Sequence, residues 1–350
     1  MKILITGNMG YVGPCVVQQL RNAYPRAQLV GLDTGLFAHC LTAADVLPET
    51  RLDGQMFMDV RDVTHDTLRG VDAVVSLAAI SNDVMGTLDE ELTLDINWRA
   101  SVRLAALARE CGARSFVFAS SCSVYGHAEE GAKTERSSVS PLTAYARSKV
   151  MAEEQLRPLA HQDFQITCLR FATACGMSER LRLDLVLNDF VAAALVSNRI
   201  EILSDGSPWR PLIHVRDMAR AIEWAVGRSA AAGGDWVIVN TGMDEWNHQV
   251  KELAEAVARE IPGVVTVVNP DAVPDKRSYR VSFELFRQLA PAHQPRVNLP
   301  QAIQELKSGL ARMRFGDPGF RNSDFMRVKA LSSLRETGRL GPDLRWVAGR

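Results

Sequence analysis

The sequence has no long apolar run, no block of like charge and no closely paired cysteines. No uninterrupted apolar stretch approaches the roughly 18 residues of a membrane span, and the apolar part of the N-terminal MKILITGNMG is too short for a secretion signal. The 40 Lys and Arg residues nearly balance the 41 Asp and Glu residues, so no charged tail indicates binding to nucleic acid or membrane. We therefore expect a soluble, cytoplasmic protein with neither of these partners.

The six cysteines contain no CxxC pair, and most of them lie among apolar residues. This distribution is typical of reduced thiols in a protein core, and it predicts no metal site. The cysteines are Cys15, Cys40, Cys111, Cys122, Cys168 and Cys175.

Short apolar segments alternate with longer helix-like segments over the first half of the chain. The apolar segments are almost continuously hydrophobic, which is typical of strands that are buried on both faces. Their alternation with helices predicts an α/β fold with a doubly wound parallel sheet and right-handed crossovers. The predicted strands are Lys2–Thr6, Gln28–Asp33, Met56–Met58, Ala73–Ala78, Ser115–Ser120, Gln165–Arg170 and Trp236–Gly242.

The second half of the chain is less regular, and Pro and Gly become denser after Pro262. With 350 residues, the chain exceeds one ordinary domain, which predicts a smaller, mixed C-terminal lobe beside the sheet domain. We assign residues 1–171 and about 211–241 to the sheet domain, and residues 172–210 and 242–350 to the second lobe. A ligand crevice is expected between the lobes, at the carboxyl ends of the parallel strands.

The segment TGNMGYVG places Gly7, Gly10 and Gly13 directly after the first predicted strand. Such glycines allow a tight turn and close approach of the backbone to a pyrophosphate, and the following helix N-terminus favours an anion. The spacing is GxxGxxG rather than GxGxxG, and alone it also fits an ordinary glycine-rich loop. Asp33, about 20 residues further on, ends the second strand where a carboxylate accepts the ribose hydroxyls. Because an acid there repels a 2′-phosphate, the pattern favours NAD over NADP.

Tyr145 and Lys149 in YARSK are four residues apart and share one face of a predicted helix. A nearby ammonium lowers the pKa of a phenol, so Tyr145 could take a proton from a substrate hydroxyl as hydride leaves. Alone, the pair also fits a half-buried Tyr with a snorkelling Lys. The glycine turn upstream and the hydroxyl-rich SSCSVYG (Ser120–Gly126) favour the catalytic interpretation.

Together these motifs resemble those of the extended short-chain dehydrogenase/reductase family, in particular its nucleotide-sugar epimerase and dehydratase branch. The resemblance covers nearly the whole chain. It also rests on DVRD (Asp59–Asp62), SLAAIS (Ser76–Ser81) and RPLIHVRDMARAI (Arg210–Ile222). It implies a Rossmann domain that holds NAD and a C-terminal lobe that holds a nucleotide-diphosphate sugar.

The resemblance also implies which residues form the site. Tyr145 would be the base, Lys149 would hold the nicotinamide ribose, and Ser121 would hydrogen-bond the reacting sugar oxygen. The predicted cofactor-binding residues are Gly7, Gly10, Tyr11, Val12, Gly13, Asp33, Asp59, Val60, Leu77, Ala78, Ala79, Tyr145 and Lys149. The predicted substrate-binding residues are Ser81, Ser121, Ser123, Thr173, Asn188, Arg210 and Arg277. Either arginine suits a diphosphate, although either could also be a surface cation.

The family pairs subunits through two helices each, which match the regions near Asn97–Cys111 and Tyr145–Leu159. The resemblance therefore implies a homodimer. Apolar residues in these regions could supply the interface, or they could equally belong to the core. These residues are Val102, Leu104, Leu107, Val150 and Leu156.

Cys122 and Ser123 stand where the sugar 4,6-dehydratases of this family carry an acid pair. A thiol and a hydroxyl do not replace that pair, so elimination of water is disfavoured. Thr173 stands where many relatives carry an Asn, and Asn188 could compensate for it. The first hypothesis is an NAD-dependent nucleotide-sugar epimerase that acts at C4 through a 4-keto intermediate. The alternatives are a dehydrogenase or 4-ketoreductase with net redox turnover, and a non-catalytic dinucleotide-sensing or scaffold protein.

Overall fold

Seven strands form one parallel sheet in the order β11-β7-β5-β4-β1-β2-β3. In this computed structural model, the described residues are 1–350 without 43, 82–88, 270–276 and 348–350. The strands are β1 (Lys2–Thr6), β2 (Gln28–Asp33), β3 (Gly54–Phe57), β4 (Ala73–Ser76), β5 (Ser115–Ser121), β7 (Gln165–Phe171) and β11 (Trp236–Thr241). The predicted parallel sheet is confirmed. The third strand begins earlier than Met56 because its pairing with β2 starts at Gly54.

The strands are buried on both faces because their apolar residues alternate between two cores. Ile3 and Ile5 of β1 belong to one hydrophobic cluster, whereas Leu4 belongs to the cluster on the opposite face. The helices α1 (Gly13–Ala23) and α7 (Val215–Gly227) cover the first face, and α4 (Ala100–Glu110) and α5 (Ala144–Leu156) cover the second. This continuous burial explains why the strand segments were readable from hydrophobicity.

The strand order reverses between β1 and β4, which opens a crevice at their carboxyl ends. Gly7 follows β1 with φ +73, a conformation that favours glycine. A Cβ atom on Gly7 would lie 2.5 Å from the backbone nitrogen of Ala78, directly after β4. Only a glycine therefore lets the ends of these two strands approach at the floor of the crevice.

A π-helical turn at Asp95–Arg99 joins α3 (Glu90–Leu94) to α4. Its Asn97 is fully buried, and the Asn97 amide exchanges hydrogen bonds with both the N–H and the carbonyl of Ile80. The same amide donates to the Ser148 hydroxyl on α5. The turn thus fixes the segment after β4 relative to α5.

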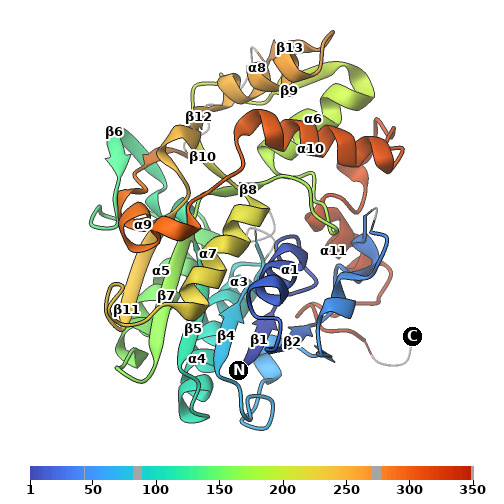
Figure 1. The fold of residues 1–350 in the computed structure, drawn as a ribbon. Helices are drawn as coiled ribbons and strands as arrows, with labels where there is room; N and C mark the ends of the chain where they lie inside the picture. The colour runs from blue at the N-terminus through green and yellow to red at the C-terminus, as the bar shows by residue number, and fades with distance from the viewer. Residues whose placement is uncertain (43, 82–88, 270–276, 348–350) are drawn as a thin grey trace.

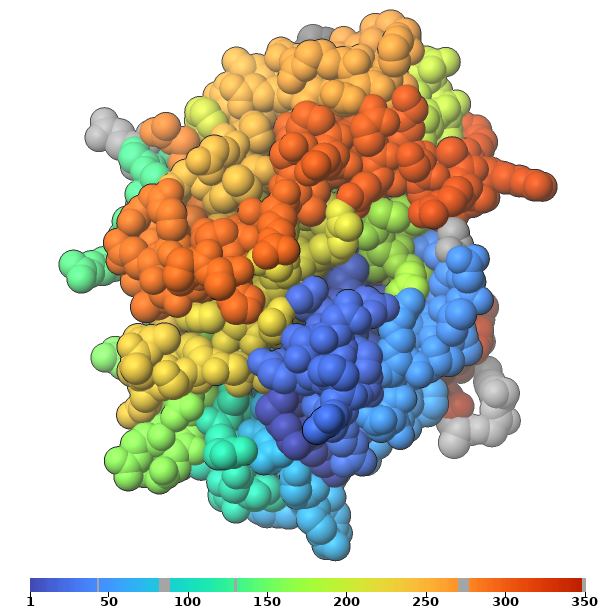
Figure 2. Space-filling view, in the orientation of Figure 1, coloured from blue at the N-terminus to red at the C-terminus, as the bar shows by residue number. Residues whose placement is uncertain are grey.

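A second group of elements, here named the C-terminal lobe, lies mostly in the upper part of the view in Figures 1 and 2, and its standing as a separate domain stays a prediction. Its main helices are α6 (Val186–Ser197), α8 (Val250–Glu260), α9 (Glu284–Leu289) and α10 (Leu299–Arg312). Three small sheets accompany them: β12-β10-β8, β13-β9 and β14-β6. Their strands are β6 (His127–Lys133), β8 (Thr173–Cys175), β9 (Arg199–Ile202), β10 (Trp209–His214), β12 (Asn247–Gln249), β13 (Val265–Val268) and β14 (Ser278–Val281).

After α10 the chain returns to the sheet domain. Helix α11 (Arg327–Glu336) lies beside the segment that follows β2 (Figure 1), and the Trp346 indole N–H donates to the carbonyl of Thr34, the residue after β2. A bridge between Leu340 and Trp346 closes this last segment into a turn.

Two features of the helices bear on earlier expectations. In α4 and α5, Leu104 and Leu156 are buried within the subunit, whereas Val102, Leu107 and Val150 are partly exposed. Pairing of subunits through these helices stays a prediction. Among the helices in the described part of the chain, none is both long and apolar enough to cross a membrane.

Candidate active site

A cavity of about 900 Å³ lies at the carboxyl ends of the strands, between the sheet domain and the C-terminal lobe. It brings together residues from β2, β5, α5, β8, β10 and α11 and from the loops that follow β1 and β4. Of the predicted site residues, it is lined by Gly7, Gly10, Tyr11, Val12, Gly13, Asp33, Asp59, Val60, Leu77, Ala78, Ala79, Ser81, Ser121, Ser123, Tyr145, Lys149, Thr173, Arg210 and Arg277.

Asn188 does not line this cavity. Its side-chain carbonyl accepts the Gly176 N–H at 2.9 Å, and its amide donates to the Tyr11 hydroxyl and the Arg182 carbonyl. The residue is fully buried on α6 and ties that helix to the wall of the cavity. A direct contact between Asn188 and substrate stays a prediction.

The glycine turn and the start of α1 form one end of the cavity. Helix α1 begins after Val12, and no side chain of the described residues caps its first N–H groups. A Cβ atom on Gly13 would lie 2.1 Å from the Asn8 carbonyl oxygen, so the helix packs directly on the turn. The uncapped N-terminus and the helix dipole suit a phosphate at this position.

Asp33 lies at the end of β2 on the same side of the cavity. Its carboxylate accepts the Met9 N–H at 3.0 Å and the Gly35 N–H at 2.8 Å. Burial raises the pKa of this carboxyl, and the two N–H donors partly offset the rise. The carboxylate is therefore fixed in place, at a position where it can accept ribose hydroxyls.

This set of groups fits a dinucleotide. The glycine turn offers backbone N–H groups to a pyrophosphate, Asp33 offers acceptors to a ribose, and Val60 and Leu77 offer apolar walls. The carboxylate of Asp59 is held by the Arg61 side chain at 2.7 and 3.0 Å and also caps the turn at Val60–Asp62. Asp59 thus shapes the loop, and its contact with adenine stays a prediction.

Tyr145 and Lys149 lie on the first turns of α5, which begins after the Thr143 cap. The Thr143 hydroxyl accepts the Ala146 N–H at 3.1 Å and sets where the helix begins. The Lys149 ammonium donates to the Ala119 carbonyl at 2.7 Å and lies 5.5 Å from the centroid of the Tyr145 ring. Burial lowers the pKa of Lys149 to about 8, and Glu153 opposes this shift. The lysine is thus still mainly a cation at neutral pH.

Ser121 ends β5 and caps the short 3-10 turn Cys122–Tyr125, its hydroxyl accepting the Ser123 N–H at 3.2 Å. The Ser123 hydroxyl oxygen is buried and has no hydrogen-bond partner among the described residues. Both hydroxyls line the cavity that holds Tyr145. They are polar groups available to a ligand with hydroxyl substituents.

Cys122, between these two serines, does not line the cavity. It is buried and donates to the Arg170 carbonyl at 3.1 Å. Burial raises the pKa of the thiol well above its ordinary value, so the reactive thiolate is not formed at neutral pH. Cys122 is a core residue.

A buried ion pair between α5 and β7 contacts the end of β5. Glu153 and Arg170 meet at 2.6 Å, and their side chains are 3% and 6% exposed. Glu153 also accepts the Ser120 hydroxyl at 2.6 Å, and Arg170 donates to the Tyr125 hydroxyl at 3.0 Å. Tyr125 is therefore structural, because its hydroxyl is engaged in this network and its ring is fully buried.

The lobe side of the cavity carries arginines. Arg210 donates to the carbonyls of Trp209 and Arg277, so the two predicted arginines lie side by side. Thr173 lies on β8, which pairs with β10 two residues beyond Arg210. These positions suit the phosphates of a second ligand.

Sequence reasoning missed Arg182 and Asp184, which form a bidentate ion pair in the cavity wall at 2.7 and 2.9 Å. Arg182 also donates to the Ser81 hydroxyl at 2.9 Å and so joins the lobe to the segment after β4. Burial lowers the pKa of Arg182, but Asp184 more than offsets this effect. The sequence ERLRLD gave no signal for them, because alternating leucines and charged residues predict that the charged set is exposed, whereas Arg180 and Arg182 are buried as well as the leucines.

No group of three or more His, Cys, Asp or Glu residues in the described part of the chain is arranged to hold a metal ion. All six cysteines are free thiols. The cavity is lined by the glycine turn, by Arg210 and Arg277, and by the tyrosine–lysine pair.

Comparison with known proteins agrees with this arrangement. The model of the NAD dependent epimerase/dehydratase family matches residues 3–239. The uncharacterized UDP-glucose epimerase YtcB of Bacillus subtilis (strain 168) is 30% identical over 245 residues, covering 67% of this chain and 75% of the relative. The dTDP-glucose 4,6-dehydratase of Streptomyces griseus is 29% identical over 308 residues, covering 86% of this chain and 91% of the relative.

Among solved structures, MoeE5 in complex with UDP-glucuronic acid and NAD has the same fold. It superposes with a TM-score of 0.76 at 24% identity, covering 89% of this chain and 99% of that chain. The family match spans the sheet domain with its glycine turn, Asp33 and the tyrosine–lysine pair. On these grounds the chain belongs to the NAD-dependent epimerase/dehydratase family of extended short-chain dehydrogenases/reductases.

Proposed function

We propose that the protein is an NAD-dependent nucleotide-sugar epimerase that acts at C4 of the sugar. The observation that carries this proposal is the grouping of Tyr145, Lys149 and Ser121 in one cavity that is also lined by the glycine turn and the two lobe arginines. The cavity has room for a dinucleotide beside a second ligand. Relatives whose names include UDP-glucose epimerase support the same choice.

NAD, when bound, would supply a hydride acceptor that can return the hydride. Tyr145 takes the proton of the C4 hydroxyl, because its phenol is the titratable group beside the Lys149 cation. Lys149 stabilises negative charge on the phenol oxygen and is itself fixed by the Ala119 carbonyl. Ser121 donates a hydrogen bond to the sugar oxygen and so stabilises charge that develops there.

The residues at positions 122 and 123 disfavour elimination of water. Elimination requires a base and an acid across two neighbouring carbons, and the thiol of Cys122 is buried against the Arg170 carbonyl. Ser123 offers a hydroxyl that stays protonated at neutral pH. Hydride transfer without elimination is therefore the chemistry that these side chains favour.

The substrate class follows from the lobe side of the cavity. Arg210 and Arg277 offer positive charge beside the sugar position, which suits the diphosphate of a nucleotide sugar. Epimerisation also requires the 4-keto sugar to turn over between the two hydride transfers. The small side chains of Ser81, Ser121 and Thr173 leave room for this rotation.

The proposal is tested with the purified protein and a panel of nucleotide sugars. An epimerase interconverts a pair of C4 epimers with no net change in NADH absorbance, and it needs no added NAD once its own cofactor is bound. If NADH instead accumulates or disappears in proportion to the sugar, the protein is the alternative, a dehydrogenase or 4-ketoreductase. Mass spectrometry of the small molecules that co-purify identifies the cofactor and the nucleotide.

A further inference from the structure

Residues 326–346, here named the C-terminal wall, reach back from the second lobe to the cofactor half of the cavity. Met326, Arg327, Val328, Leu331 and Leu344 line the same cavity as the dinucleotide-binding residues. In Figure 1 the wall descends beside the segment that follows β2. No motif in the sequence assigns this segment to the site.

An apolar cluster holds the wall against the sheet domain. Leu331, Leu334, Leu340 and Leu344 are buried together with Ile80 and Leu92, which belong to the segments that follow β4. Leu36 and Phe37, three and four residues after Asp33, pack on the same cluster. The wall therefore covers the loop that positions the ribose-binding carboxylate.

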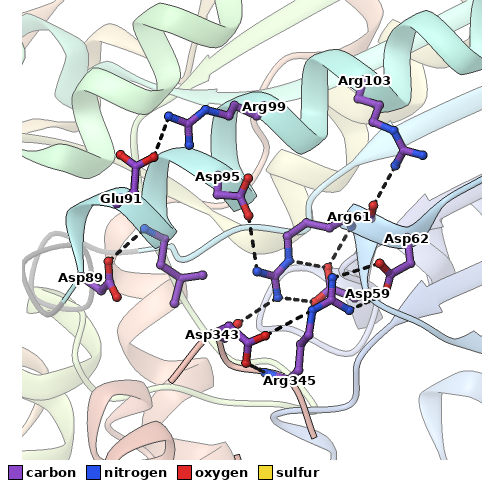
Figure 3. Close-up of polar contacts among 11 residues, drawn as sticks. Asp59, Arg61, Asp62, Asp89, Glu91, Asp95, Arg99, Arg103, Asp343 and Arg345 are labelled. Atoms are coloured by element: carbon purple, nitrogen blue, oxygen red, sulfur yellow. Dashed lines mark hydrogen bonds and ion pairs between the residues drawn. The ribbon is translucent and has the colours of Figure 1, made fainter. Parts of the chain in front are cut away.

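Polar contacts fasten the end of the wall at three points. Arg345 makes two contacts with the Asp62 carboxylate, at 2.5 and 2.9 Å, and Arg61 donates to the Asp343 carbonyl at 2.8 Å (Figure 3). The Trp346 indole N–H donates to the Thr34 carbonyl at 2.6 Å. All three contacts reach loops that also carry predicted cofactor residues, because Asp59 precedes Arg61 and Asp33 precedes Thr34.

Arg327 brings a buried positive charge to this part of the cavity. Residue Arg327 is 2% exposed. No carboxylate of the described residues forms an ion pair with its guanidinium within 4.0 Å. It donates to the Arg180 carbonyl at 2.8 Å, and its guanidinium lies 4.8 Å from the centroid of the Phe37 ring. Burial lowers the pKa of Arg327 to about 10, so the group remains charged at neutral pH. A buried cation without a carboxylate partner is suited to a bound phosphate.

We propose that the C-terminal wall is part of the NAD site, where Arg327 faces the cofactor's phosphates and the wall slows release of the cofactor. The wall lies over the adenosine half of the site, and the cofactor leaves only when the wall separates from Asp62 and Thr34. A retained cofactor suits an enzyme that returns its hydride to the same sugar. The inference rests on NAD binding and not on which sugar reaction follows, so it is tested without substrate.

The first experiment measures the rate at which NADH leaves the full-length protein, by dilution into excess NAD. Arg345→Glu replaces the Asp62 contact with repulsion, and we expect release to be about fivefold faster, the effect of losing one partly exposed ion pair. Arg335→Glu, the same charge change on the exposed side of α11, leaves the rate unchanged. Combining Arg345→Glu with Asp62→Arg restores slow release. Equal rates in all four proteins would overturn the proposal.

The second experiment asks which ligand Arg327 contacts. Arg327→Gln keeps most of the side-chain volume, and circular dichroism and thermal unfolding establish that the variant folds. We expect its affinity for ADP-ribose to fall about tenfold, the effect of losing one charged hydrogen bond to a phosphate, and its affinity for UDP to stay unchanged. The reverse result, with UDP weakened and ADP-ribose unaffected, assigns Arg327 to the substrate diphosphate and overturns its placement in the cofactor site.

Discussion

The ammonium nitrogen of Lys149 lies 5.5 Å from the centroid of the Tyr145 ring and 4.7 Å from that of Phe118. The lysine is buried between the two rings and held by the Ala119 carbonyl. The position of this cation is therefore set by the end of β5 as well as by α5. Strand and helix together place the charge beside the phenol.

Tyr145→Phe should abolish turnover while leaving the cofactor bound. The variant keeps the ring and its packing on Lys149 but loses the proton acceptor, so the rate should fall about 10²- to 10⁴-fold. Turnover of a nucleotide sugar and NAD content per subunit are the two measurements. Activity within tenfold of the parent would show that another group is the base.

Tyr125→Phe is the matched control for that experiment. Its hydroxyl contacts Arg170, Asn240 and the Thr134 carbonyl in the core and does not face the cavity. We expect a loss of stability of about 1–3 kcal/mol from unsatisfied buried partners, with turnover of the folded protein retained. Denaturant unfolding and a rate normalised to folded protein separate the two effects.

Lys149 should make the free energy of unfolding increase with pH above neutrality. Its pKa is about 8 in the folded protein against 10.5 for an ordinary lysine, so folding releases its proton between these values and raising the pH favours the folded state. The expected gain between pH 7 and pH 9.5 is about 2 kcal/mol. Denaturant unfolding of the parent and of Lys149→Met at both pH values measures it.

The change in the free energy of unfolding with pH must be compared between the parent and Lys149→Met. Burial raises the pKa of buried thiols and phenols, so these groups make the free energy of unfolding decrease as the pH rises. Cys15, whose pKa burial raises to about 12, is one such group. Groups that do not interact with Lys149, such as Cys15, are common to parent and variant and cancel in the difference. A parent and variant that respond identically to pH would contradict the lowered pKa of Lys149.

The buried pair of Glu153 and Arg170 should be essential for stability rather than for chemistry. Burial alone lowers the pKa of Arg170, but Glu153 more than offsets this effect, so the arginine stays charged. Glu153→Gln leaves that charge without a counter-ion and should cost about 3–5 kcal/mol. Asp66→Asn, which breaks the exposed pair with Arg69, should have no measurable effect on denaturant unfolding. A Gln variant as stable as its parent would refute the role given to this pair.

The parts of the site that the sequence predicts are those built from neighbouring residues. The glycine turn, Asp33 and the Tyr145–Lys149 pair depend on spacing along one strand, turn or helix, and the structure places them all on one cavity. The parallel sheet was predictable for a similar reason, because each strand is a continuous apolar segment. In these elements the spacing of residues along the sequence is enough to predict the strand, turn or helix that they form.

The parts that could not be predicted are contacts between segments that are distant in the chain. Arg182 reaches Ser81 and Arg345 reaches Asp62, and nothing in the residues around either arginine indicates its partner. Asn188 was expected near the substrate because it could replace the Asn that many relatives carry at the position of Thr173. In the structure its amide instead hydrogen-bonds groups within the protein, among them the Tyr11 hydroxyl. The docking of the C-terminal wall depends on tertiary packing, which no sequence period encodes.

Asp33→Asn should weaken the preference for NAD over NADP. Asn keeps the shape of the side chain but removes the charge that repels a 2′-phosphate, and its amide accepts only one of the N–H groups of Met9 and Gly35. We expect affinity for NADH to fall about tenfold, the effect of losing one charged hydrogen bond, and affinity for NADPH to rise. Titration calorimetry with both cofactors measures the ratio, and Asp163→Asn on an exposed loop is the control for charge alone. An unchanged ratio in Asp33→Asn would mean that this carboxylate fixes the glycine turn without selecting the cofactor.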